Sequence, residues 1–449
     1  MHCTKGYETA WRGRIVGLDI LTPLLNGRLA PYVNLDNAAT TPPLREVVEA
    51  VHNFLPYYSS VHRGTGFKSR LSTRTYDDAH EAIARFVGAN PNTNTVIFGK
   101  NTTEAINKLA FRYPLGSRDI VVSTVMEHHS NDLPWRSRAQ VVRAGVTREG
   151  RLDEDDLDRL LAEHGDRIAL VAVSGASNVT GFVQPIHRIA RKTHAVGARI
   201  LVDAAQLAPH RRIDMKPDDD DEHLDYVALS AHKMYAPFGT GALVGRRDTF
   251  LQGAPEYQGG GTVDIVTATE VEWAGLPDRE EAGTPNLVGA MAMAVAARTL
   301  MEAKMDALAV HEAMLTAYAI ERLRSIPCVT IYGETDPTRR DRVGVIAFNV
   351  VGLHHALVAA ILGYEGGIGA RSGCFCAQPY VARLLGLTEP ARGIPRPGMV
   401  RISLGAYNTV DDIDAVVAML GRIVRREYLG DYRLTETGEF CPAGTGRMF

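Results

Sequence analysis

Cysteine is scarce in this chain, with five residues among 449, an odd number that is widely scattered. Such a set does not make the disulfide framework of a small secreted domain. The longest apolar runs, such as residues 290–297, are too short to cross a bilayer, and the amino terminus lacks the apolar core of a secretory signal. We therefore expect a cytoplasmic protein with no membrane partner.

An excess of positive charge is also missing, because the formal net charge is −3. That balance provides no electrostatic field for nucleic acid, so we expect no nucleic-acid partner. Repeats and low-complexity segments are absent from the sequence. The acidic run at residues 218–222 separates two apolar segments and predicts a solvated loop.

The chain is too long for one simple core, which favours two domains. From about residue 95 to 245, short apolar runs alternate with helical patterns. This alternation predicts an α/β fold, with a mostly parallel sheet covered by helices on both faces. We expect strands at 96–98, 120–122, 168–173, 200–202 and 226–229, and helices from 103, at 153–164 and at 185–195.

A second unit is predicted to begin near residue 301, after a helix rich in Ala and Met. We expect a large domain at 32–300 and a smaller α+β domain built from 1–31 and 301–430. Residues 431–449 are polar and contain glycine, which predicts a loosely held carboxyl-terminal tail.

The most informative stretch is Ser230-Ala231-His232-Lys233, which follows a strand pattern and precedes a Pro/Gly loop. A lysine among apolar residues and tight turns is poorly solvated, so its pKa should fall and its amine should become a nucleophile. Asp203 ends the preceding strand and could face the pyridine nitrogen of pyridoxal phosphate (PLP) while Lys233 holds the aldehyde carbon. A surface lysine and a structural salt bridge are the alternatives.

Several polar residues share one feature, since each follows a strand pattern where the chain enters a loop. Ligands of such sheets bind beyond the carboxyl ends of the strands, so this coincidence favours one common site. Thr102 and Thr103 also open a helix, whose free amides could bind a phosphate, although a plain threonine cap is the alternative. The residues in question are Thr102 and Thr103, Glu127 and His128, Asn178, Asp203, and His232 and Lys233.

A glycine-rich loop carries two thiols, Cys374 and Cys376, close to the cation of Arg371. Such surroundings lower the pKa of a thiol and make it a nucleophile, whereas the usual fate of a free cysteine is to be a small buried hydrophobe. Arg401 lies in a strand pattern and could hold a substrate carboxylate with two hydrogen bonds, or form a structural ion pair.

The sequence predicts no metal site. Adjacent histidines such as His128 and His129 point to opposite sides of an extended segment and cannot easily share one ion. Two cysteines separated by one residue, without a second pair, do not make a zinc site. His128 could instead stack on a flat cofactor.

Together, these segments resemble the class V, fold-type I PLP-dependent enzymes, and within them the group II cysteine desulfurases and selenocysteine lyases. The resemblance runs from about residue 32 to 425 and rests on ten ordered motifs. They are Leu35-Asp36-Asn37-Ala38-Ala39-Thr40, Val61-His62-Arg63-Gly64, Thr102-Thr103-Glu104-Ala105-Ile106-Asn107, Glu127-His128-His129-Ser130-Asn131, Ser177-Asn178-Val179, Asp203-Ala204-Ala205-Gln206, Ser230-Ala231-His232-Lys233, Ala282-Gly283-Thr284-Pro285-Asn286, Cys376-Ala377-Gln378-Pro379 and Tyr407-Asn408-Thr409.

This resemblance implies roles for individual residues around the cofactor. Lys233 would hold it covalently, Asp203 would bind its ring nitrogen, His128 would stack on the ring and Gln206 would touch the phenolic oxygen. The phosphate would be held by Thr102, Thr103, Ser230 and His232, and by Gly283 and Thr284 of a neighbouring subunit, so the family pattern implies a homodimer. Substrate would be held by Asn178, Arg371 and Arg401, with His62 as a weaker candidate.

The implied reaction converts L-cysteine to L-alanine. Lys233 would move the α proton, and the Cys376 thiolate would attack the substrate sulfur and keep it as a persulfide for an acceptor protein. The chain departs from the family at Cys374-Phe375, where His-His commonly precedes the reactive cysteine. This Cys-Phe-Cys loop looks like that of the desulfurase domain in molybdenum cofactor sulfurases.

Two other functions stay open at this point. One is a class V aminotransferase, epimerase or tailoring lyase that acts on another amino acid, with Cys376 incidental. The other is a catalytically silent scaffold that binds a sulfur-carrier protein, although such a scaffold would have no reason to keep both Lys233 and Asp203.

Overall fold

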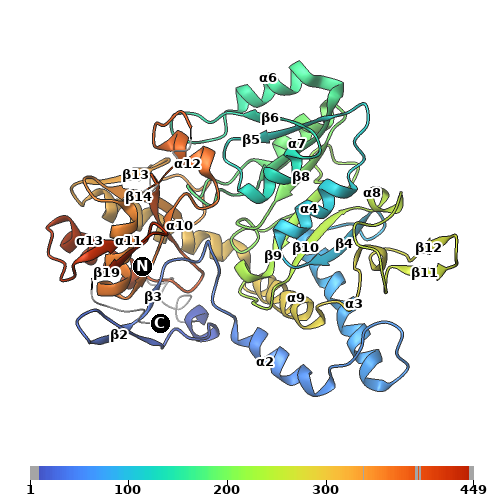
Figure 1. The fold of residues 1–449 in the computed structure, drawn as a ribbon, viewed down its shortest axis with the longest axis horizontal. Helices are drawn as coiled ribbons and strands as arrows, with labels where there is room; N and C mark the ends of the chain where they lie inside the picture. Colours follow the sequence, from blue (N-terminus) through green and yellow to red (C-terminus); the bar gives the residue numbers. More distant parts are fainter. Residues whose placement is uncertain (1–9, 337, 390–392, 394–395, 444–449) are drawn as a thin grey trace.

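A seven-stranded sheet organises the larger part of the molecule (Figure 1). The structure is a computed structural model that describes residues 10–336, 338–389, 393 and 396–443. The strand order is β4-β10-β9-β8-β7-β5-β6, in which only β10 runs antiparallel to its two neighbours. The strands are β4 (Asn94–Gly99), β5 (Ile120–Thr124), β6 (Gln140–Ala144), β7 (Ile168–Ser174), β8 (Arg199–Asp203), β9 (Tyr226–Ser230) and β10 (Gly241–Arg246).

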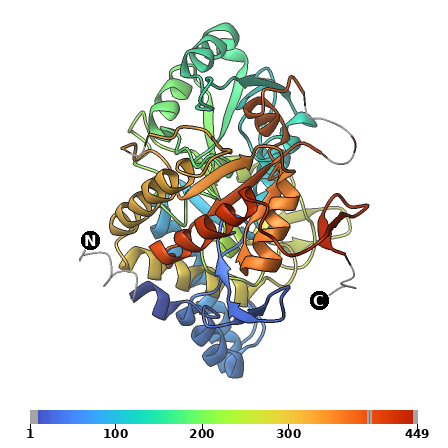
Figure 2. The same cartoon turned by 90° about the vertical axis from the view of Figure 1, so that its left-hand side faces the viewer.

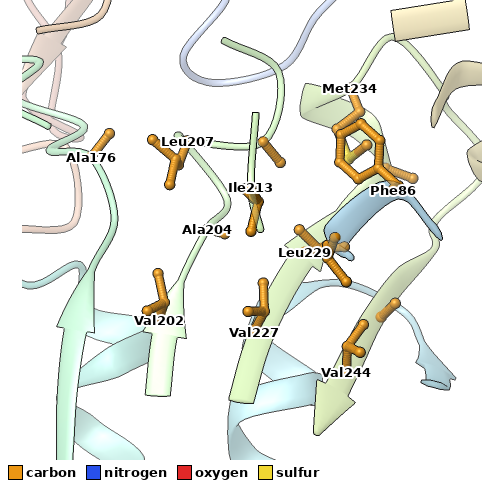
Figure 3. Packing of buried hydrophobic residues seen from close by; sticks show 14 of the residues in the cluster. Phe86, Ala176, Val202, Ala204, Leu207, Ile213, Val227, Leu229, Met234 and Val244 are labelled. Atoms are coloured by element: carbon orange, nitrogen blue, oxygen red, sulfur yellow. The ribbon is translucent and has the colours of Figure 1, made fainter. Parts of the chain in front are cut away.

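Both faces of this sheet are buried, because successive side chains of a strand point to opposite faces. In β8, Ile200 and Val202 join one apolar cluster while Leu201 joins another. Figure 3 shows the first face, where Val202, Val227 and Val244 of three neighbouring strands line up. The near-continuous apolar character of these strands is therefore a consequence of their double burial.

Helices cover the two faces unequally. The first cluster includes residues of α2 (Arg45–Phe54), α3 (Phe67–Val87), α6 (Glu154–His164), α7 (Ile186–Ala195) and α9 (Leu287–Glu302). The second face is covered mainly by α4 (Thr102–Arg112), together with the fully buried Trp135 of α5 (Leu133–Arg136) and Phe250 of α8 (Arg247–Leu251). The sheet thus forms the middle of three layers.

A second, smaller core lies beside the first (Figure 2). Its antiparallel sheet has the order β13-β14-β17-β16. Three of the four helices beside it contribute apolar residues to the same cluster, whereas Tyr380 and Val381 of the fourth belong to the larger one. The elements are α10 (Met305–Arg324), β13 (Val329–Tyr332), β14 (Val345–Val350), α11 (His355–Gly366), β16 (Arg371–Gly373), α12 (Gln378–Leu384), β17 (Met399–Ser403) and α13 (Val410–Val424).

The amino-terminal segment reaches the smaller core. Strand β3 (Val33–Asn34) pairs in parallel with β15 (Ile368–Gly369), and Leu35 is buried in the smaller core. Before it, β1 (Leu21–Pro23) and β2 (Leu29–Pro31) form a hairpin. The domain boundaries given above stay a prediction, but this pairing explains how residues from both ends of the chain can share one unit.

Two further hairpins project from the cores. One joins β11 (Val263–Val266) to β12 (Val271–Trp273). The other, β18 (Tyr432–Leu434) with β19 (Phe440–Pro442), lies within the segment expected to be a loose tail, and the Tyr432 hydroxyl bonds to Glu365. Among the described residues, no helix combines the length and apolar character needed to cross a bilayer.

All five strands expected from the sequence are present, as are the helices expected from 103 and near 153–164 and 185–195. The sequence did not predict β6 and β10. β6 is an edge strand with mostly half-buried side chains, and β10 has a glycine near each end. Both patterns are too weak to stand out from a loop in a sequence.

Candidate active site

A cavity of about 350 Å³ lies where the carboxyl ends of the central strands meet the smaller core. Its walls come from the loops after β4, β5, β7, β8 and β9, and from the segment after β16. Of the residues predicted for the site, it contains Thr102, Thr103, His128, Asn178, Asp203, Gln206, Ser230, His232, Lys233, Arg371, Cys376 and Arg401.

The pKa values of Lys233 and Asp203 are both shifted in this cavity. Burial lowers the pKa of Lys233 to about 8, and the Asp203 carboxylate opposes that fall. Asp203 is buried, and burial raises its pKa even though its Oδ1 accepts the Ala205 N–H at 3.0 Å. A lysine with a lowered pKa offers a neutral amine near physiological pH, which is what a nucleophile or a proton acceptor requires.

His128 is held as a neutral ring on the loop after β5. Its Nδ1 accepts the Ser130 N–H at 3.1 Å. Burial and the nearby Lys233 cation lower the pKa of His128 to about 3. An uncharged imidazole with a fixed orientation suits stacking on a flat ring rather than pairing with a carboxylate.

The amino end of α4 opens into the cavity. Asn101 caps the helix by accepting the Glu104 N–H at 3.0 Å. Ser230 Oγ accepts from both the amide and the hydroxyl of Thr102, at 2.9 and 3.0 Å. Thr103 Oγ1 lies 2.7 Å from Ser130 Oγ. Hydroxyls and a helix amino terminus gathered in this way make a favourable site for a phosphate.

The loop that carries Cys376 is held by its main chain. Asn178 Nδ2 donates to the Phe375 carbonyl at 2.6 Å, and the His129 N–H donates to the Cys376 carbonyl at 2.7 Å. Phe375 and Cys376 have φ of 52° and 55°, in the left-handed region that costs energy for residues other than glycine. Phe375 is buried while Cys376 is exposed. The strained turn therefore buries the phenyl ring and presents the thiol to the cavity.

Arg401 and Arg371 meet at one carboxylate, that of Asp36. Arg371 binds Asp36 with two nitrogens, at 2.8 and 3.0 Å, and Arg401 Nη2 lies 3.1 Å from Asp36 Oδ1. Arg401 is only 2% exposed, and its Nε has no hydrogen-bond partner among the described residues. A substrate carboxylate would therefore have to share these arginines with Asp36.

Three of the predicted residues lie outside the cavity of this single chain. His62 Nδ1 is 4.0 Å from Asp278 Oδ2. Gly283 donates its N–H to the Gly260 carbonyl, and Thr284 borders a different pocket. The family pattern assigns Gly283 and Thr284 to a neighbouring subunit, so their roles stay a prediction, as do those of the cavity residues.

Sequence reasoning gave no role to Asp36 or Glu127, although Glu127 stood among the residues expected at the common site. Glu127 is buried behind His128 and accepts hydrogen bonds from Thr124, Ser174 and Asn131, each at 2.7 Å. Burial raises the pKa of Glu127 to about 7. Both acids stood in motifs already recognised, and for Glu127 its position beside His128 was the available signal.

Comparison with known proteins agrees with this geometry. Residues 33–416 match the family model described as aminotransferase class-V. The chain belongs to this family. The class-V fold-type I architecture predicted from the sequence is therefore confirmed, and the protein is an enzyme of the PLP-dependent class.

Named relatives of this class-V chain are cysteine desulfurases. It is 36% identical over 420 residues to a probable cysteine desulfurase of Halalkalibacterium halodurans, covering 92% of this chain and 97% of the relative. It is 36% identical over 414 residues to a cysteine desulfurase of Haloferax volcanii, covering 90% and 92% of the two chains.

Solved structures give the same result. A cysteine desulfurase from Thermococcus onnurineus matches with a TM-score of 0.78 and 31% identity, covering 88% of this chain and 95% of the other. The cysteine desulfurase CsdA from Escherichia coli, in an S-sulfonic acid form, matches with a TM-score of 0.77 and 28% identity, covering 94% and 99%. The predicted resemblance to cysteine desulfurases is thus confirmed.

The residues present fit pyridoxal phosphate. Gln206 Nε2 donates to the Ala38 carbonyl at 2.5 Å, whereas its buried Oε1 has no partner among the described residues. A buried acceptor without a partner is costly unless a ligand satisfies it. The cavity also combines a lysine of lowered pKa, a buried carboxylate and a helix amino terminus, which match an aldehyde, a ring nitrogen and a phosphate.

Proposed function

We propose that this enzyme is a cysteine desulfurase, which converts L-cysteine to L-alanine and keeps the sulfur as a persulfide on Cys376. One observation carries the proposal: Lys233, Asp203 and Cys376 border the same cavity, although 173 positions separate Asp203 from Cys376 in the sequence. An amine, a buried acid and a thiol are the three groups that this reaction requires.

Pyridoxal phosphate, when bound by the residues above, would withdraw electrons from Cα of the substrate. Asp203 would hold a proton at the ring nitrogen and so maintain that withdrawal. Lys233 would take the proton from Cα, because its amine is neutral for a substantial part of the time near its pKa of about 8.

Two arginines would orient the substrate. Arg401 has an unpartnered buried Nε, and Arg371 is its neighbour on the adjacent strand. A carboxylate that binds both would partly replace Asp36, so binding would exchange one ion pair for another. Asn178 would act through the loop, because its side chain holds the Phe375 carbonyl.

Cys376 would carry out the sulfur transfer. Its thiolate attacks Sγ of the substrate, the new S–S bond forms, and the Cβ–S bond breaks with its electron pair passing to Cβ. A proton then adds at Cβ. The balance is L-cysteine plus the enzyme thiol giving L-alanine plus the enzyme persulfide, with no outside oxidant.

The test is alanine formation from L-cysteine by the holoenzyme and by Cys376→Ser. We expect alanine release to fall on the order of 1,000-fold and the persulfide to disappear from the Cys376 peptide in mass spectrometry. Cys374→Ser is the matched control, since burial raises the pKa of Cys374 and makes it the poorer nucleophile.

Unchanged alanine release by Cys376→Ser would contradict the desulfurase mechanism. Incubation with a panel of amino acids, with alanine, sulfide and keto acids measured together, would then identify the aminotransferase, epimerase or lyase chemistry that is the alternative. A sulfur-acceptor protein, a homodimer and a cytoplasmic location are also part of this proposal.

A further inference from the structure

Two histidines and an aspartate meet at the edge of the central sheet opposite the cavity. His194 lies in the last turn of α7, Asp225 immediately precedes β9, and His223 lies two residues before Asp225. Parallel strands β8 and β9 begin at this edge, and the cavity lies where they end. The cluster is therefore separate from the active site, and no step of the proposed reaction uses it.

The three side chains converge on one point. His194 Nε2 is 3.0 Å from Asp225 Oδ2, and His223 Nε2 is 3.4 Å from Asp225 Oδ1. All of these ligand atoms lie within 4.8 Å of one another. In a tetrahedral site with metal–ligand bonds of 2.0–2.1 Å, neighbouring ligand atoms are about 3.3 Å apart. The two nitrogen–oxygen separations, each to a different oxygen of Asp225, lie on either side of that value.

The other nitrogen of each ring fixes its tautomer. His194 Nδ1 lies 2.7 Å from the Asp221 carbonyl, and His223 Nδ1 lies 2.7 Å from the Asp220 carbonyl. A backbone carbonyl only accepts, so each Nδ1 must carry a proton. In a neutral ring, Nε2 then has a lone pair, and this lone pair faces the carboxylate of Asp225.

Lone pairs that face a carboxylate require a positive charge between them. A proton on one ring or one divalent cation supplies it, whereas protons on both rings, which are stacked 4.2 Å apart at an angle of 19°, would place two imidazolium charges face to face. One divalent cation satisfies both nitrogens and the carboxylate together. A ligating histidine that donates its second N–H to a backbone carbonyl is the usual arrangement around protein-bound metals.

We propose that His194, His223 and Asp225 bind a divalent first-row transition metal ion, with Zn²⁺ as the probe of choice. Imidazole and carboxylate ligands suit such ions, and a fourth position is left for water because both histidines are partly exposed. The acidic run at 218–222 supplies the two carbonyls that hold the rings and adds negative charge near the ion.

Binding would connect α7 to the loop before β9. Asp225 Oδ2 also accepts the Ile200 N–H of β8 at 2.9 Å, so the ion would join a helix, a loop and a strand. We therefore assign a structural role to this site, with an effect on stability and none on the rate of alanine formation.

The experiment is a Zn²⁺ titration of chelator-treated holoenzyme, followed by calorimetry and by the thermal midpoint. All samples carry Cys374→Ser and Cys376→Ser, so that the two loop thiols do not bind the metal. His223→Gln and Asp225→Asn are the test variants. His187→Gln is the matched control, because His187 lies on the same helix and its Nδ1 contacts the carbonyl of Glu222 in the same loop at 2.9 Å.

We expect one equivalent of Zn²⁺ to bind to the parent and to His187→Gln, and affinity to fall at least about 100-fold in both test variants. Zn²⁺ should raise the thermal midpoint only where it binds. Co²⁺ should give the visible absorption of a four-coordinate nitrogen and oxygen site. Retention of the cofactor absorption band in each variant shows that it is folded.

Two outcomes overturn the proposal. Absence of a tight equivalent in the parent would mean that the cluster is an imidazolium–carboxylate ion pair. Equal affinity in His223→Gln, Asp225→Asn and the parent would place the Zn²⁺ elsewhere on the protein.

Discussion

The two edges of the central sheet differ in how their polar groups are satisfied. At the carboxyl edge, Lys233 has a lowered pKa, and Gln206 Oε1 is buried without a partner among the described residues. At the amino edge, Arg199 contacts Asp248, Tyr226 and Thr249, and Arg118 donates to two carbonyls. The carboxyl edge of the sheet therefore carries polar groups without protein partners in the described part of the chain, whereas the arginines at its amino edge are paired.

This difference follows from the topology. Parallel strands bring all their carboxyl ends to one side, where the following loops can surround a ligand. Groups intended for a ligand are left unpaired in the protein alone, at a cost in stability that the rest of the fold tolerates. At the opposite edge, apart from the cluster of His194, His223 and Asp225, arginines and carboxylates neutralise one another.

The largest expected effect comes from removing the Lys233 amine at the carboxyl edge of the sheet. Lys233→Ala should reduce alanine formation on the order of 1,000-fold or more, because no other amine takes over at Cα. Lys216→Ala is the control from the opposite edge, where Lys216 forms ion pairs with Asp220 and Glu222. Initial rates with L-cysteine measure both, and a loss below about tenfold in Lys233→Ala would contradict the role given to that lysine.

A second, intermediate effect concerns Glu127, which is buried behind His128 at the carboxyl edge of the sheet. Its pKa of about 7 is higher in the folded protein than in the unfolded chain, so the folded state binds more protons between about pH 4.5 and 7. The stability it contributes is present at low pH and is lost as the pH rises through 7. One pKa unit corresponds to about 1.36 kcal/mol, so the loss of stability is on the order of 3 kcal/mol.

Urea denaturation at pH 5 and pH 8 measures this effect. Glu127→Gln cannot titrate, so its free energy of unfolding should decline less between the two pH values than that of the parent. Glu163→Gln is the matched control, because Glu163 pairs with Arg159 on the surface. An identical decline in Glu127→Gln and the parent would rule out the raised pKa.

The smallest expected effect concerns the ion pair of Arg199 and Asp248 at the amino edge of the sheet. Burial alone would raise the pKa of Asp248, but the Arg199 guanidinium lowers it. The pair is partly exposed, so Asp248→Asn should reduce the free energy of unfolding at pH 7 by less than about 1 kcal/mol. The difference from the parent should vanish as the pH falls through the pKa of Asp248. A loss above about 2 kcal/mol in urea denaturation would show that this edge is more than a solvated surface.

Much of the cavity was predictable because its residues follow strands. Asp203 and Lys233 each come directly after an apolar run, and such runs are readable in a single sequence. Glu127 and Asp36 were given no role, because a carboxylate reveals its role only through what surrounds it. The hydrogen bond from Ser174 to Glu127 and the two arginines around Asp36 come from distant parts of the sequence.

The cluster of His194, His223 and Asp225 illustrates the same limit. Twenty-nine positions separate the two histidines by their numbers, and no familiar spacing of metal ligands connects them. Only the packing of α7 beside β8 and β9 brings the rings within 4.2 Å. The acidic run that precedes Asp225 indicated a solvated loop, and its carbonyls proved to be the groups that orient both rings.

By itself, the sequence indicated five of the seven strands of the central sheet, the class of cofactor chemistry and the amine and thiol that we expect to react. These depend on apolar periodicity and on reactive residues at strand ends, which are local properties of the chain. The tertiary structure alone decided that Asp36 occupies both arginines, that Cys376 is presented by a strained turn, and that three distant residues converge at the other edge. Contacts between segments far apart in the chain depend on how the elements pack, and no short stretch of residues reveals that packing.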